Sequence, residues 1–222
     1  RRPAERRLNW HEYRKIFLDE QRIAGGVEFW QQNQATLERA EKEYGVAPEV
    51  IVAIIGVETR YGRVTGRHRV VDALMTLAFD YPPRASFFRK ELTQFLLLAR
   101  EEGKNPTSLT GSYAGAMGFG QFIPSSYRNY AVDFDRDGVR DIWQNRTDAI
   151  GSVANYFSRH GWRGAAQVTL PVQLKAETEQ LLDIANQSLK PTHSVAEMAE
   201  MGVNVDGLDP EARVLLLRLL GG

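Results

Sequence analysis

The segment Pro48–Tyr61 constrains the fold of this 222-residue chain more than any other feature. It reads Pro-Glu-Val-Ile-Val-Ala-Ile-Ile-Gly-Val-Glu-Thr-Arg-Tyr, so apolar residues would occupy every side of a helix. Its β-branched residues would also suit a buried strand. Pro48 at the start, Glu49 in the first turn and Gly62 after the end favour a helix. We therefore expect an interior helix that other elements surround.

Helical periodicity marks most other segments as well, so we expect a mainly α protein. Trp10–Tyr44 predicts one surface helix, or two with a break at Gly25–Gly26. Further helices are predicted over Val71–Phe79, Ser86–Glu102, Asp148–His160, Leu181–Ala185, Val195–Met201 and Pro210–Leu220. Gln167–Leu174 alternates like a short edge strand. The pattern predicts an N-terminal helical segment (1–47), a core (48–165) and a small mixed α/β appendage (166–222).

Composition excludes several classes of function. The chain has 28 Lys and Arg and 28 Asp and Glu, so its formal net charge is zero, which argues against nucleic-acid binding. It has no cysteine, which excludes disulfides, thiolate catalysis and Cys-based zinc sites. No apolar run approaches the roughly 20 residues that a membrane span needs. The chain begins at Arg1 without a signal pattern, so we expect it to be processed or trimmed.

Glu58 is the first candidate for catalysis. At helical spacing its neighbours are Ile54, Ile55, Tyr61 and Gly62, so no cation lies one turn away. Poor solvation and the nearby helix C-terminus would both raise the pKa of its carboxyl group, as a general acid near neutral pH requires. The alternative is a structural glutamate that reaches a distant Arg or lies at an exposed helix end.

The stretch Gly111–Gly120 holds four glycines in ten residues and is predicted to be a loop with close backbone approaches. Taken alone, such a cluster is also typical of plain turns. Glu58-Thr-Arg-Tyr-Gly62, followed by Ser112-Tyr-Ala-Gly-Ala-Met-Gly-Phe-Gly-Gln-Phe-Ile-Pro124, strongly resembles the lytic murein transglycosylases of the membrane-bound lytic transglycosylase B family (glycoside hydrolase family 103). The resemblance covers Tyr13–Trp162.

This resemblance implies a lysozyme-like helical core in 48–165, with Glu58 as the catalytic residue. It also implies that Ser112 and Gln121 contact the glycan near that carboxylate, and that Tyr156 is another cleft residue. Two further positions, Tyr13 and Arg84, match family residues near the bound sugar or peptide stem. The family normally continues beyond this sequence, so we expect the appendage to be truncated.

The implied reaction needs one carboxyl group. Protonated Glu58 would donate to the oxygen between N-acetylmuramic acid and N-acetylglucosamine while the 2-acetamido group of the substrate stabilises the sugar cation. Ionised Glu58 would then take the proton of the muramic C6 hydroxyl, which leaves a 1,6-anhydromuramoyl end without consuming water. The nearest acids in sequence, Asp72, Asp80 and Glu91, lie in no cleft-like motif. Two alternatives stay open: a hydrolytic muramidase on the same fold, and a non-catalytic, calcium-stabilised glycan-binding module.

An acidic loop follows the pattern of an EF-hand. It reads Asp133-Phe-Asp135-Arg-Asp137-Gly-Val139-Arg-Asp141-Ile-Trp-Gln144, with Asp at positions one, three, five and nine and a backbone carbonyl at seven. Gln144 replaces the usual bidentate Glu at position twelve, and we expect Asp148 to take that role after a longer loop, as in the family. Hard oxygen ligands predict a structural Ca²⁺ in 133–148. A solvated turn is the alternative.

The resemblance further implies where such a protein works and what it meets. Its partners would be peptidoglycan glycan strands and other cell-wall enzymes, and the chain would be a monomer. Its location would be the periplasm of a Gram-negative bacterium, and a lipid-anchored parent form would attach to the outer membrane.

Overall fold

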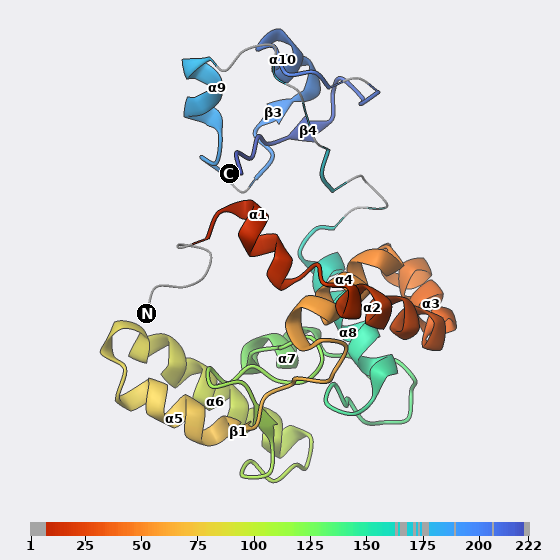
Figure 1. The fold of residues 1–222 in the computed structure, drawn as a ribbon. Coiled ribbons are helices and arrows are strands. Elements are labelled where there is room, and N and C mark those ends of the chain that lie inside the picture. Colours follow the sequence, from red (N-terminus) through yellow and green to blue (C-terminus); the bar gives the residue numbers. More distant parts are fainter. Residues whose placement is uncertain are drawn as a thin grey trace. The chain divides into compact units, whose positions relative to one another are not determined.

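The computed structural model describes residues 8–162, 164, 168–170, 172, 174, 178–188, 190–205 and 207–219. By its internal contacts the chain forms two units, Phe17–Ala166 and Arg1–Ile16 with Gln167–Gly222. The larger unit is built mainly from helices, and the smaller unit combines short helices with a two-stranded sheet (Figure 1). The mainly α prediction is confirmed, whereas the boundaries 1–47, 48–165 and 166–222 stay a prediction.

The larger unit holds the candidate catalytic residue. Its helices are α2 (Glu20–Gln32), α3 (Gln34–Tyr44), α4 (Pro48–Thr59), α5 (Val70–Phe79), η3 (Pro82–Arg84), α6 (Ala85–Glu101), α7 (Pro124–Tyr130) and α8 (Arg146–Arg159). Strands β1 (His68–Arg69) and β2 (Thr110–Gly111) pair antiparallel. The sequence predicted α4, α5, α6 and α8 to within two residues, but it placed no boundary between α2 and α3 at Asn33 and missed α7, a short helix that begins at a proline.

The smaller unit is mixed, as expected. Its elements are α1 (Trp10–Tyr13), η2 (Arg14–Ile16), α9 (Glu179–Ile184), α10 (Val195–Glu200) and the paired strands β3 (His193–Ser194) and β4 (Arg213–Val214). Leu181, Met198 and Val203 form its apolar centre. The predicted helix Pro210–Leu220 is wrong over its described part, because Arg213–Val214 pairs as a strand. The predicted strand Gln167–Leu174 lies partly outside the described residues; its last residue, Leu174, bridges Val203.

Helix α4 packs against α2, α3 and α8 in the larger unit, but it is not interior on all sides. Ile51, Val52 and Ile55 are buried where α2, α3 and α8 pack against the helix. Val57 is 45% exposed, and Glu58 is exposed beside it. Composition cannot distinguish a face covered by protein from an apolar face left open, so the expectation of complete burial was wrong. The open face carries the candidate carboxyl group.

The C-terminal end of α4 is locked to α2 by one aromatic side chain. The Tyr61 hydroxyl donates a hydrogen bond to the backbone carbonyl of Arg22 at 2.9 Å. A Cβ atom at Gly26 would lie 2.7 Å from the Tyr61 oxygen, and one at Gly56 would lie 2.6 Å from it. Helix α2 therefore runs unbroken through Gly25–Gly26, where the sequence allowed a break, because these glycines make room for the ring.

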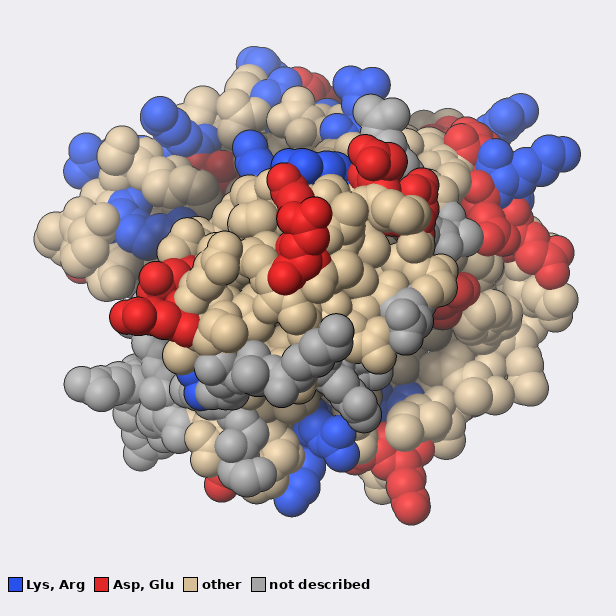
Figure 2. Space-filling model, turned by 90° about the horizontal axis from the view of Figure 1, so that it is seen from above, with Lys and Arg blue, Asp and Glu red and all other residues tan. Residues whose placement is uncertain are grey.

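Surface charge is mixed in sign. On the face drawn in Figure 2, Lys and Arg side chains and Asp and Glu side chains are both exposed, interspersed with neutral residues. None of the described helices has the length and apolar character that crossing a bilayer requires.

Candidate active site and acidic loop

Glu58 lies in the last turn of α4, next to an unusual helix end. Arg60, Tyr61 and Gly62 all have positive φ, at 50°, 62° and 85°. Such conformations cost about 1–3 kcal/mol in a non-glycine residue and persist only where surrounding contacts hold them. The Arg60 N–H donates to the Gly56 carbonyl at 3.1 Å, and the Tyr61 ring is fixed against α2. The turn that follows Glu58 is thus held by tertiary packing.

The carboxyl group of Glu58 is accessible and still perturbed. Its side chain is exposed, so the expected poor solvation is only partial. The protein atoms around it nevertheless remove enough water to raise the pKa of Glu58 above its ordinary value. The direction of the predicted pKa shift is confirmed. Its cause is partial desolvation of an open carboxyl group.

Thr59 joins this helix end to the Gly-rich loop. Its buried hydroxyl donates to the Phe119 carbonyl at 2.8 Å and accepts the Gly62 N–H at 3.0 Å. A Cβ atom at Gly62 would lie 2.1 Å from the Phe119 ring, and one at Gly66 would lie 2.1 Å from the Gly111 carbonyl. The predicted close backbone approach is therefore observed. Sequence reasoning did not select Thr59, because a threonine beside an apolar run carries no signal of its distant partner.

Ser112 and Gln121 hold the loop in shape. The Ser112 Oγ accepts backbone N–H groups of Ala114 at 3.2 Å and Ala116 at 3.0 Å. Gln121 has φ 50° and donates its Nε2 to the carbonyls of Thr65 and Gly118, at 3.2 and 3.0 Å. The described contacts use the Ser112 oxygen and the Gln121 Nε2. On these two side chains, the Ser112 hydroxyl proton and the Gln121 Oε1 remain available to a ligand.

Tyr156, on α8, belongs to an aromatic cluster at the other end of the loop. Its ring meets Phe122 edge-on at a centroid distance of 5.9 Å and Tyr130 at 5.2 Å. The His160 ring stacks on it at 4.0 Å. Because Phe122 follows Gln121 directly, the loop connects the end of α4 to Tyr156. The structure thus links Glu58, through Thr59, with Ser112, Gln121 and Tyr156; sequence reasoning missed the stacked His160.

Two further predicted site residues, Arg84 and Tyr13, lie at the ends of short helices. Arg84 ends η3 at the turn between α5 and α6 and stacks on Phe87 at 4.4 Å and Phe88 at 5.2 Å. Tyr13 ends α1 in the smaller unit. Their roles near the sugar or peptide stem stay predictions.

The other acids considered from sequence have structural partners in two cases. Glu91 is 5% exposed and accepts the Ser125 N–H at 2.9 Å, at the start of α7. Asp72 accepts the Arg69 Nε at 2.6 Å. Asp80 follows the last residue of α5 and is exposed. Of these four acids, Glu58 is the one that lies next to the residue bonded to the Gly-rich loop, and the described contacts give its carboxyl group no hydrogen-bond partner.

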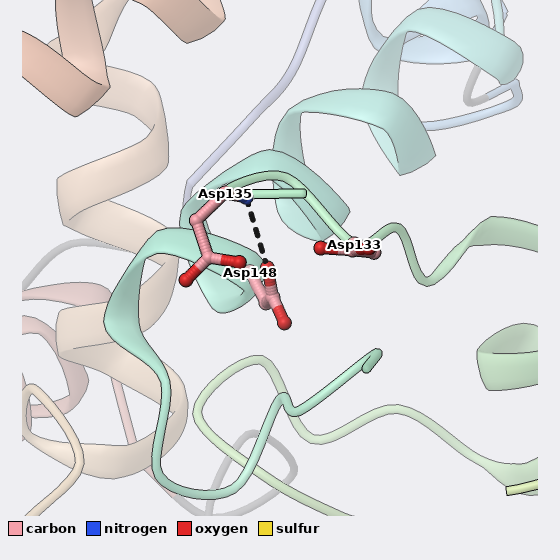
Figure 3. A group of neighbouring side chains, drawn as sticks. All are labelled: Asp133, Asp135 and Asp148. Carbon is pink, nitrogen blue, oxygen red and sulfur yellow. Dashed lines mark hydrogen bonds between the residues drawn. The ribbon is translucent and has the colours of Figure 1, made fainter. Parts of the chain in front are cut away.

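The acidic loop brings three carboxylates together. One oxygen from each of Asp133, Asp135 and Asp148 lies within 4.8 Å of the other two, and Figure 3 shows these side chains gathered at the start of α8. Asp148 is fully buried. It accepts the backbone N–H groups of Phe134 at 2.7 Å and Asp141 at 2.8 Å. Its burial raises the pKa of Asp148, against the lowering effect of these hydrogen bonds.

The remaining predicted ligands stabilise turns of the same loop. Asp137 Oδ1 accepts the Val139 N–H at 2.8 Å, and Asp141 Oδ1 accepts the Trp143 N–H at 2.9 Å. Arg136 and Gly138 have φ of 67° and 93°. Three converging carboxylates, one of them buried, repel one another unless a cation offsets their charge. The donor set is compatible with Ca²⁺, which prefers hard oxygen ligands. The roles of Asp137, Val139 and Asp141 as ligands stay predictions.

Comparison with known proteins decides the family. Residues 1–219 match the model of the transglycosylase SLT domain. The chain belongs to this family. Membrane-bound lytic murein transglycosylase B of Escherichia coli (strain K12) is 50% identical over 194 residues, which are 87% of this chain and 52% of that protein. The SLT-domain chain thus spans about half the length of this curated relative.

Solved structures of related proteins share the fold. Soluble lytic transglycosylase SltB1 from Pseudomonas aeruginosa matches all of this chain and 73% of its own, with 53% identity and a TM-score of 0.92. Escherichia coli lytic transglycosylase Slt35, in complex with calcium, matches 95% of this chain and 65% of its own, with 47% identity and a TM-score of 0.85. SltB3 from Pseudomonas aeruginosa, in complex with NAG-anhNAM-pentapeptide, matches 90% and 54%, with 31% identity and a TM-score of 0.78. The expected family and lysozyme-like helical fold of the SLT-domain chain are confirmed.

Proposed function

We propose that this chain is a peptidoglycan lytic transglycosylase in which Glu58 is the single catalytic carboxyl group. One observation carries the proposal. In a chain of the transglycosylase SLT domain family, an accessible carboxyl group with a raised pKa stands one residue from the hydroxyl that joins α4 to the Gly-rich loop. The Escherichia coli relative is a lytic murein transglycosylase, and the SltB3 structure holds a peptidoglycan fragment, which supports the same substrate here.

The reaction moves one proton out of Glu58 and one back. Protonated Glu58 donates to the oxygen between N-acetylmuramic acid and N-acetylglucosamine, and the bond from that oxygen to the muramic C1 breaks. The acetamido oxygen of the muramic residue stabilises the cation at C1. Ionised Glu58 then takes the proton of the C6 hydroxyl while its oxygen bonds to C1. The product carries a 1,6-anhydromuramoyl end, Glu58 is protonated again, and no water is consumed.

The position of Glu58 suits both steps. The raised pKa keeps a larger share of the group protonated near neutral pH than an ordinary glutamate would have. Exposure on the open face of α4, next to Val57, lets a sugar approach the carboxyl group. The Ser112 proton and the Gln121 Oε1 can bond to sugar hydroxyl and acetamido groups, because the loop presents them without rearrangement.

A calcium ion bound by the acidic loop would have a structural role. Asp133, Asp135 and Asp148 would hold it, with the Val139 carbonyl, Asp137 and Asp141 as further ligands. When bound, the ion supplies charge compensation and no chemistry. Asp148 lies in the first turn of α8, the helix that also carries Tyr156, so fixing this loop fixes the start of that helix. The calcium in the Slt35 structure supports this assignment.

The proposed substrate also sets the location. Peptidoglycan strands are met in the periplasm, and the membrane-bound relative is consistent with a lipid-anchored form of the parent at the outer membrane. We infer that the chain acts there as a monomer alongside other cell-wall enzymes.

Mass spectrometry of peptidoglycan digested by the chain tests the proposal. Released fragments should carry anhydromuramoyl ends. Reducing muramic ends would make the protein a hydrolase, and binding to sacculi without any released fragment would make it a glycan-binding module.

A further inference from the structure

A pocket lies beside the Gly-rich loop. It has a volume of about 390 Å³. Its lining includes His68 and Arg69 of β1, Asp72, Ala73 and Leu77 of α5, and Tyr113 of the loop. None of these residues has a part in the proposed proton transfers or in the acidic loop. The volume lies in the range of small-ligand sites, which are usually few in a protein.

This pocket is contiguous with the proposed glycan-binding loop. His68 pairs with Gly111 across the two-stranded sheet, and Ser112 and Tyr113 follow directly. A Cβ atom at Gly66 would lie 2.5 Å from the Ser112 nitrogen, so the segment that leads from α4 to β1 touches the loop backbone. The pocket therefore lies beside the loop residue that directly follows Ser112.

Tyr113 presents an aromatic ring at the edge of this pocket. Its side chain is 76% exposed, so its ring is available to a ligand. The backbone beneath it is fixed, because the Ser112 Oγ accepts two N–H groups and the Gly115 N–H donates to the Ser112 carbonyl at 3.0 Å. An exposed ring on a fixed backbone is a suitable platform for the apolar face of a sugar.

The charges of the lining favour a neutral ligand. The Arg69 Nε donates to the Asp72 Oδ2 at 2.6 Å, so the two charges offset each other. Both side chains are about half exposed and offer hydrogen-bond donors and acceptors at the rim. A carboxylate of a peptide stem would meet Asp72 and gain little from a guanidinium that is already paired. A hydroxylated, uncharged sugar can use both groups.

We propose that this pocket is an outer saccharide subsite, which binds a neutral N-acetylated sugar of the glycan strand beyond the scissile bond, with Tyr113 stacked on its ring. The inference rests on the proposed function, since it requires a strand along the Gly-rich loop. It adds a residue, Tyr113, that determines how strongly long strands bind and leaves the chemical step unchanged.

Calorimetric titration of the Glu58→Gln chain with β-1,4-linked N-acetylglucosamine oligomers tests the subsite without cleavage. Adding Tyr113→Ala should weaken binding of the hexasaccharide about tenfold, which is about 1.4 kcal/mol, and should leave the trisaccharide almost unaffected. Tyr113→Phe should restore the hexasaccharide affinity, because the ring remains. Phe79→Ala removes another exposed ring of the same unit that does not line the pocket, and it should change neither affinity.

Three outcomes would overturn the subsite: equal losses for both oligomers, no loss for either, or a parent chain that binds neither oligomer. Its failure is separable from failure of the proposed function. A Glu58→Gln chain that still cleaves sacculi sinks the catalytic assignment whatever Tyr113 does. An inert Glu58→Gln chain whose binding ignores Tyr113 removes the subsite alone.

Discussion

Glu58 and Asp148 are two carboxyl groups whose pKa is raised by loss of water, yet their surroundings are opposite. Asp148 is fully buried and accepts backbone N–H groups from Phe134 and Asp141. Glu58 is exposed, and loss of water alone raises its pKa, with no hydrogen bond lowering it. The first group holds a loop in shape, whereas the second is free to meet a ligand.

Their positions on helices explain this difference. Asp148 lies in the first turn of α8, where free N–H groups and the helix dipole stabilise a negative charge. Glu58 lies in the last turn of α4, where backbone carbonyls face outward and the dipole opposes a negative charge. The presence of hydrogen-bond donors distinguishes the structural carboxylate of Asp148 from the carboxyl group of Glu58, which can give and take a proton. Burial distinguishes them less well, because loss of water raises the pKa of both.

The largest expected effect tests the free carboxyl group. Glu58→Gln should lower cleavage of peptidoglycan by at least about 10³-fold, since it removes the one group that donates and takes up protons in the proposed reaction. Fold and glycan binding should persist, because the side chain is exposed and the change is nearly isosteric. Release of soluble muropeptides from sacculi measures it. Glu49→Gln, at another exposed glutamate of α4, is the control and should keep full activity. A Glu58→Gln chain that keeps most of its activity would show that Glu58 is not the catalytic carboxyl group.

The next effect tests Asp148, the carboxylate that accepts backbone hydrogen bonds. Asp148→Ala should lower the free energy of unfolding by about 3 kcal/mol, because it leaves buried N–H groups without an acceptor. Asp148→Asn keeps one acceptor oxygen and should cost less, but it should abolish any rise of the melting temperature with Ca²⁺. Thermal unfolding with Ca²⁺ and with chelator measures both, and Asp80→Ala serves as an exposed control. A Ca²⁺ response that survives in Asp148→Asn would remove Asp148 from the ligand set.

Sequence reasoning located both groups because each has a local signal. Glu58 interrupts an apolar helix, and the alternating aspartates mark the acidic loop. The start of α4 at Pro48 was also predictable, since proline has a strong preference for the first turn of a helix. The pattern of Gly25–Gly26 was ambiguous from sequence, because the ring that fills their space comes from Tyr61, far along the chain.

The features that could not be predicted from the sequence depend on tertiary contacts. The exposure of Val57 and Glu58 depends on which face of α4 its neighbours cover. The hydrogen bonds of Thr59 and Gln121 join segments about sixty residues apart, and nothing in the local sequence indicates which carbonyl each side chain binds. The stack of His160 on Tyr156 follows from helix geometry at i and i+4, which periodicity could have suggested.

A smaller effect concerns the link between Glu58 and the loop. Thr59→Val removes the bonds to the Phe119 carbonyl and the Gly62 N–H, and should lower the free energy of unfolding by about 1–2 kcal/mol. It should also lower kcat/KM about tenfold, because small misplacements near a catalytic group are costly. Urea denaturation and muropeptide release measure the two. Thr59→Ser keeps the hydroxyl and should recover both values. Lost stability with unchanged kcat/KM would show that the loop position does not matter for the reaction.

The smallest effect is on stability as a function of pH. Since the folded-state pKa of Glu58 is raised, the folded chain binds more protons than the unfolded chain between the two pKa values. The contribution of Glu58 to stability is therefore full below its unfolded pKa and is lost as pH rises through the folded pKa. Glu58→Gln has no such loss, so its melting temperature relative to the parent should rise from about pH 4 to about pH 7. The rise should be slight, because solvent screens an exposed carboxyl group. If the relative melting temperature falls instead, a hidden donor stabilises the ionised form, and Glu58 would belong with Asp148 as a structural carboxylate.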